Sequence, residues 1–62
     1  MDIPDCRLTG EDGNVFNIIG RVCKALKANG MKDRADEFRK RAFSLKSYNE
    51  VLVLCHEYVN IR

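Results

Sequence analysis

The sequence predicts an all-α protein, a compact three-helix bundle with a short extended N-terminal arm. Three observations lead to this fold class. Apolar residues recur at helical spacing in three segments. Each segment begins at a residue that can cap a helix. Only a few residues join one segment to the next, which makes successive helices neighbours. A chain of 62 residues allows one domain, so we expect 1–62 to form a single helical domain.

The N-terminal segment 1–13 is expected to form the arm and a turn. Pro4 blocks a helix and disfavours helical geometry at Ile3. The composition of residues 9–14 is typical of a turn. The arm should lie across one end or one groove of the bundle. Whether it is irregular or a short strand stays open from the sequence.

The first helix is predicted over residues 14–29. The Asn14 side chain can accept a hydrogen bond from a free backbone N–H of the first turn. Gly30 follows as a C-terminal cap, because it enters the left-handed region cheaply. On a helical wheel, one half is apolar and should be buried. That half holds Val15, Phe16, Ile18, Ile19, Val22, Cys23, Ala25 and Leu26.

The second helix is predicted over residues 33–43, with Asp33 as its N-cap. A narrow apolar stripe should face the core. Its members are Met31, Ala35, Phe38, Ala42 and Leu45. Pairs of opposite charge at i, i+4, such as Glu37 with Arg41, would support the helix. Phe43 falls well off the stripe.

The third helix is predicted over residues 48–59. Ser47 and Glu50 have the spacing of a capping box, in which each side chain satisfies a free backbone donor. The apolar run 51–55 would also suit a buried strand. The wheel favours a helix, although Val53 falls on its polar face and Leu54 at the border.

Several segments carry a resemblance, namely residues 8–16, 19–22, 24–26, 41–43 and 47–52. Through them the chain resembles a group of short uncharacterised proteins of bacteria and their phages or mobile elements. The resemblance extends over residues 7–60. It implies a bacterial, cytoplasmic setting, and it assigns neither an activity nor site residues.

Composition excludes some classes of protein. A hydrophobic share of 45% argues against disorder. No apolar run approaches the roughly 18 residues of a membrane span, so we expect no membrane partner. The first residues lack the basic and apolar parts of a secretory signal. We therefore expect a cytoplasmic protein with reduced cysteines.

The cysteines and the single histidine match a zinc site in residue type only. Cys6, Cys23, Cys55 and His56 contain no C-x-x-C pair. Cys55 and His56 are adjacent on the predicted helix and point in directions about 100° apart, which also excludes a thiol–imidazole pair. We expect neither metal, nor cofactor, nor enzymatic activity.

Charge is unevenly distributed along the chain. The basic block, residues 21–46, holds nine cations against three carboxylates, between acidic ends. It makes nucleic-acid binding an alternative function. The candidate contacts are Arg21, Lys24, Lys27, Arg34, Arg39, Lys40 and Arg41. Against this function, Arg39, Lys40 and Arg41 do not share one side of the helix, and the helix offers little for reading bases.

Apolar residues outside the predicted core provide the other functional signal. These residues are Phe43, Val53, Leu54 and Ile61. One explanation is that the N-terminal arm covers them, or that the second helix ends before Phe43 and its ring turns inward. The other is that they form a surface for a protein partner or a second copy. Because so small a domain benefits from a partner, our first hypothesis is a helical protein-interaction module, with a homodimer as one form.

Overall fold

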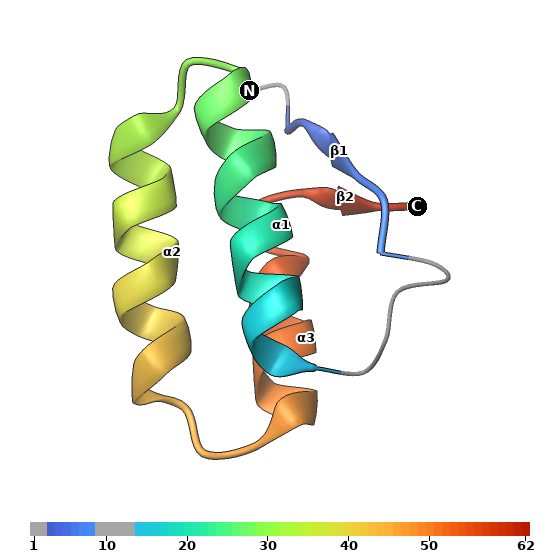
Figure 1. The fold of residues 1–62 in the computed structure, drawn as a ribbon, viewed down its shortest axis with the longest axis vertical. Helices are drawn as coiled ribbons and strands as arrows, with labels where there is room; N and C mark the ends of the chain where they lie inside the picture. The colour runs from blue at the N-terminus through green and yellow to red at the C-terminus, as the bar shows by residue number, and fades with distance from the viewer. Residues whose placement is uncertain (1–2, 9–13) are drawn as a thin grey trace.

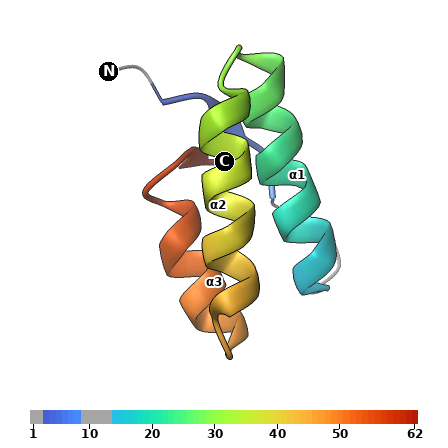
Figure 2. The ribbon, with the colours of Figure 1, turned by 90° about the vertical axis from the view of Figure 1, so that its left-hand side faces the viewer.

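Three helices and two short strands make up the computed structural model, which describes residues 3–8 and 14–62. The order along the chain is β1 (Asp5–Cys6), α1 (Val15–Ala28), α2 (Lys32–Ser44), α3 (Tyr48–Cys55) and β2 (Asn60–Ile61). The helices α1 and α2 run antiparallel side by side (Figure 1). In the side view, α1 and α3 lie on opposite sides of α2 (Figure 2). The predicted fold class, an all-α three-helix bundle, is confirmed.

Both ends of α1 follow the local signals of the sequence. Asn14 is the N-cap, and its Oδ1 accepts the Phe16 N–H at 2.8 Å. At the other end Gly30 has φ of 75°. There the Met31 N–H donates to the Leu26 carbonyl at 2.8 Å, and the Gly30 N–H donates to the Lys27 carbonyl at 3.1 Å. These two bonds form a Schellman motif, which requires the left-handed glycine.

The helix α2 begins one residue earlier than predicted, at Lys32. Its N-cap is Met31, which makes no side-chain capping bond, so the prediction of Asp33 as N-cap is wrong. The Schellman motif places Met31 directly at the start of α2, where its carbonyl accepts the Ala35 N–H at 2.9 Å. Asp33 lies in the first turn, where its negative charge favours the positive end of the helix dipole.

The helix α3 begins as predicted at Tyr48 and ends at Cys55, so the predicted end at residue 59 is wrong. At its start, the Ser47 hydroxyl accepts the Glu50 N–H at 3.1 Å. The expected reciprocal bond has a different form, because the Glu50 carboxylate accepts from the Ser47 hydroxyl at 3.2 Å. After Cys55 a turn buries Tyr58 and leads into β2.

The C-terminal segment leaves the helix because it pairs with the N-terminal arm. The strands β1 and β2 are parallel, with Asp5 opposite Asn60 and Cys6 opposite Ile61. The backbone N–H groups of Asn60 and Arg62 donate to the carbonyls of Pro4 and Cys6, both at 2.9 Å. Within residues 3–8 of the arm, Asp5–Cys6 therefore form a short strand, and this pairing gives backbone partners that an extended third helix would leave unmade. The turn predicted over residues 9–13 lies outside the described residues.

One core joins all these elements. Its largest fully buried side chains are Phe38, Leu26, Val22, Val59 and Cys55. Phe38 meets Tyr58 edge-on, with ring centroids 5.3 Å apart. This packing holds α1 against α2 and fixes the groove that runs along their outer side.

Candidate functional site

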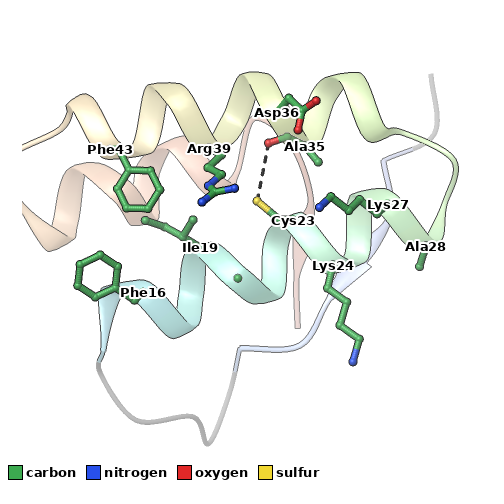
Figure 3. Close-up of a pocket in the computed structure, with 11 residues that line it drawn as sticks. Phe16, Ile19, Cys23, Lys24, Lys27, Ala28, Ala35, Asp36, Arg39 and Phe43 are labelled. Carbon is green, nitrogen blue, oxygen red and sulfur yellow. Dashed lines mark hydrogen bonds between the residues drawn. The ribbon is translucent and has the colours of Figure 1, made fainter.

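A groove runs between α1 and α2 and has a volume of about 730 Å³. We call it the α1–α2 groove. It is lined by Phe16, Ile19, Gly20, Cys23, Lys24, Lys27, Ala28, Ala35, Asp36, Arg39 and Phe43. Buried Ile19 and Ala35 and half-buried Cys23 form an apolar floor (Figure 3). The charged side chains stand along both helices, so the groove combines an apolar base with a charged rim.

Helical spacing explains why these side chains meet. On α1, Phe16, Gly20, Cys23 and Lys27 recur at i, i+4, i+7 and i+11. On α2, Asp36, Arg39 and Phe43 recur at i, i+3 and i+7. Such positions lie on one side of a helix. Each helix therefore presents a row of side chains to the groove, next to the face that packs into the core.

Two phenylalanines stand at one end of the groove. The rings of Phe16 and Phe43 have centroids 6.0 Å apart and planes tilted by 38°. Phe16 is 66% exposed and Phe43 is 52% exposed. Both also line a neighbouring hollow of about 440 Å³, together with Tyr48 and Val51 of α3. The exposed aromatic surface therefore continues around the end of the bundle.

The exposure of Phe16 differs from the prediction that it faces the core. On the wheel Phe16 lies at the edge of the wide apolar half of α1, closer in direction to Cys23 than to Ile18 or Val22. The core takes Ile18 and Val22, and the edge residue turns outward beside Phe43. A signal for this was present: Phe43 also falls off its own helical stripe.

Five of the seven basic candidates gather around the groove. Lys24, Lys27 and Arg39 line it. Arg21 lines a hollow beside Phe16, and Lys40 lines one beside Phe43. The Arg39 and Lys27 side chains point into the space between the helices, whereas Lys24 points away from α2 (Figure 3).

The charges of the rim are only partly neutralised. Among residues 3–8 and 14–62, Asp36 is the one carboxylate that lines the groove. The Arg39 guanidinium lies 5.7 Å from the centre of the Phe43 ring. Within residues 3–8 and 14–62, neither Lys24 nor Lys27 forms an ion pair. The groove therefore presents positive charge over an apolar floor.

The other two basic candidates have structural partners. Arg34 stacks over the Tyr58 ring at 4.6 Å and donates to the Glu57 carbonyl at 3.3 Å. Arg41 pairs with the Glu57 carboxylate at 3.3 Å and donates to the Tyr58 hydroxyl at 3.1 Å. Arg41 thus points to Glu57 and not to Glu37, its expected partner one turn away. Both arginines hold the C-terminal turn on α2.

The four apolar interface candidates do not form one surface. Phe43 lines the groove, whereas Val53 is 68% exposed on α3. Leu54 is only 4% exposed, so its expected place outside the core is wrong. The reason is that α3 contacts both α1 and α2, which widens its buried face beyond the wheel's apolar arc. Ile61 is half-buried in β2 and packs against the core.

The three thiols have no partner cysteine. Burial raises the pKa of Cys23, against the opposing effect of Lys27 and Arg39. Its Sγ donates to the Ala35 carbonyl at 3.7 Å (Figure 3). Burial also raises the pKa of Cys6, and it raises that of Cys55 to about 11, with a further contribution from Cys6. Protonated thiols of this kind are poor nucleophiles at neutral pH.

Neither a metal-binding cluster nor a membrane-spanning helix is present in the described part of the chain. In the described part of the chain, no three His, Cys, Asp or Glu side chains are grouped so as to hold a metal ion. No helix of that part is both long and apolar enough to cross a bilayer.

Comparisons with protein-family models, with curated proteins and with solved structures give no significant match. The resemblance to short bacterial and phage proteins therefore stays a prediction. The α1–α2 groove is the candidate functional site.

Proposed function

We propose that this chain is a small helical protein-interaction module that binds its partner in the α1–α2 groove. The observation that carries the proposal is the exposed pair Phe16 and Phe43 beside an apolar floor. Large exposed aromatic side chains next to a pocket are typical anchors of protein interfaces. No packing need of the bundle itself explains two such rings at the surface.

The shape of the groove supports a protein ligand. Two antiparallel helices with a hollow between them are a common receptor for a third, amphipathic segment. The floor side chains Ile19, Cys23 and Ala35 suit apolar side chains of a partner. The raised thiol pKa values argue against a cysteine nucleophile in the groove.

Charge argues against self-association through this surface. A symmetric dimer places the same patch of both copies face to face. The cations Lys24, Lys27 and Arg39 of one copy would then face the same cationic patch of the other, and like charges across an interface are unfavourable. We therefore propose that the partner is a different protein and not a second copy of this chain.

The proposal is tested by selecting random displayed peptides on the whole protein. We expect enriched peptides that bind the wild type and Val53→Ser, and that bind Phe43→Ser much less. Val53 is the matched control, because it is an apolar residue outside the groove and is at least as exposed as Phe43. A selection that enriches nothing, or peptides that bind all three proteins equally, would refute the proposal.

Nucleic-acid binding is the second candidate, and one observation favours it. Arg21, Lys24, Lys27, Arg39 and Lys40 lie around two exposed rings, a combination that suits single-stranded nucleic acid. If this candidate is right, adding the protein raises the fluorescence anisotropy of labelled single strands at about 50 mM salt. The binding should weaken steeply at about 200 mM salt. The Asp36 carboxylate on the rim disfavours phosphate, so we place this candidate second.

A further inference from the structure

Gly20 occupies the middle of the groove face of α1 for no reason internal to the bundle. A Cβ added there would meet no atom within 4 Å. In the described chain only Gly30 has a positive φ, so Gly20 has ordinary helical geometry. Glycine inside a helix is less stable than alanine by about 0.5–1 kcal/mol. A residue without a side chain, kept beside the groove floor, leaves the α1 backbone open to close approach.

Cationic side chains stand on both sides of the groove, with the excess of positive charge on α1. Lys24 and Lys27 stand on α1, whereas on α2 Arg39 stands near the Asp36 carboxylate. An occupant that matches this arrangement carries carboxylates on both flanks of an apolar ridge. An amphipathic helix with acidic residues beside its apolar stripe has that arrangement.

The groove between α1 and α2 is suited to the packing of a further helix. Helices pack at interaxial distances of about 8–10 Å, and small side chains at the crossing permit the lower values. Gly20 supplies such a crossing point on α1, and Ala35 supplies a small residue on α2. A helix laid there would add a fourth member to the bundle.

We propose that the α1–α2 groove binds an acidic amphipathic helix of a partner protein. Its apolar side chains contact Ile19, Cys23 and the Phe16–Phe43 pair. Its carboxylates meet Lys24, Lys27 and Arg39, and its backbone passes closest to α1 at Gly20. This inference rests on the proposed function and adds the chemistry of the partner.

The test is a displayed library of amphipathic helices, separate from the random peptides above. Its apolar positions vary among Leu, Ile, Met and Phe, and each flanking position is either Glu or Lys. Selection on the intact wild-type protein should enrich helices with Glu at the flanks. The doubly substituted protein Lys24→Glu/Lys27→Glu should enrich helices with Lys instead, whereas Lys32→Glu, a charge reversal outside the groove, should keep the preference for Glu.

A second variant tests the close approach at Gly20. We expect Gly20→Leu to raise or preserve the melting temperature, because the added side chain points into open space. The same change should weaken the best Glu-flanked helix by about tenfold or more, measured by fluorescence anisotropy of the labelled peptide, because it occupies the crossing point. Unchanged affinity would show that no backbone passes there and would overturn the proposed geometry.

The outcomes separate this inference from the proposed function. Enrichment of Lys-flanked helices, equal use of both residues, or no enriched helix would each overturn the acidic-helix partner. If random peptides nevertheless bind in a Phe43-dependent way, the interaction module stands and only its partner class falls. Binding of single-stranded RNA that is lost in Lys24→Glu/Lys27→Glu, with no enriched helix, would assign the groove to nucleic acid instead.

Discussion

The rings of Phe16 and Phe43 lie 6.0 Å apart across the end of the α1–α2 groove, one from each helix, and both remain more than half exposed. The pair brings together one residue of α1 and one residue of α2 that are far apart in the sequence. It contributes little to the core, because Phe38 and not Phe43 is the fully buried aromatic of α2. The stability of the fold and the chemistry of the groove can therefore be separated by substitution.

Phe43 and Phe38, the two aromatic residues of α2, should differ in how much they stabilise the fold. Phe43→Ala should lower the free energy of unfolding by only about 0.5–1.5 kcal/mol, the range for an aromatic pair. Phe38→Ala should lower it by about 3–5 kcal/mol, because it opens a cavity in the core. Urea denaturation followed by circular dichroism measures both. Equal losses would mean that Phe43 belongs to the core.

The two described glycines should respond in opposite ways to alanine. Gly20→Ala should raise the free energy of unfolding by about 0.5–1 kcal/mol, because the helix gains a better helix former at no steric cost. Gly30→Ala should lower it by about 1–2 kcal/mol, because a Cβ is strained at φ of 75°. In a domain of this size, each kcal/mol shifts the melting temperature by about 4–8 °C. Melting temperatures that shift in the same direction for both variants would contradict the account.

Alkaline pH should destabilise the fold through Cys55. Its pKa is raised from 9.0 to about 11, so the folded state keeps a proton that the unfolded state has lost between these values. The stability from this group is fully present below pH 9.0 and is lost as pH rises towards 11. Urea midpoints from pH 8 to pH 11 should fall less steeply in Cys55→Ala than in the wild type. Parallel curves would refute this role of Cys55.

Thiol labelling should distinguish the cysteine of the groove from the other two. Cys23 is half-buried in the groove floor, whereas Cys6 and Cys55 are buried. A thiol reagent at neutral pH should modify Cys23 first, and a peptide bound in the groove should slow that reaction without affecting the others. Mass spectrometry of digested protein gives the order. Early modification of Cys55 would contradict the described core.

Apart from the N-cap of α2, which is Met31 and not Asp33, the sequence predicted the capping features that depend on neighbouring residues. Asn14, Gly30 and Ser47 each act within a few positions of the chain, and each forms the capping contact expected of its residue type. The parallel pairing of Asp5 with Asn60 depends on residues at opposite ends of the chain. Its strands are two residues long and carry no periodicity, so the early end of α3 was missed.

The groove was only partly predictable. The basic block and the off-stripe position of Phe43 were visible as patterns. A helical wheel does not show which edge of a wide apolar face the neighbouring helix covers. For that reason Phe16 was expected inside and Leu54 outside, and the structure has them the other way round. The sequence does not separate Arg34 and Arg41 from the groove cations, because their contacts with the Tyr58 ring depend on the fold of the C-terminal turn.

The most direct test of the central claim is a ¹H–¹⁵N correlation spectrum of the protein during titration with the strongest selected peptide. Our account predicts shifts of the amide signals of Gly20, Cys23 and Arg39, with little change at Val53 on the exposed side of α3. A titration that shifts Val53 and its neighbours while the groove signals stay in place would contradict it.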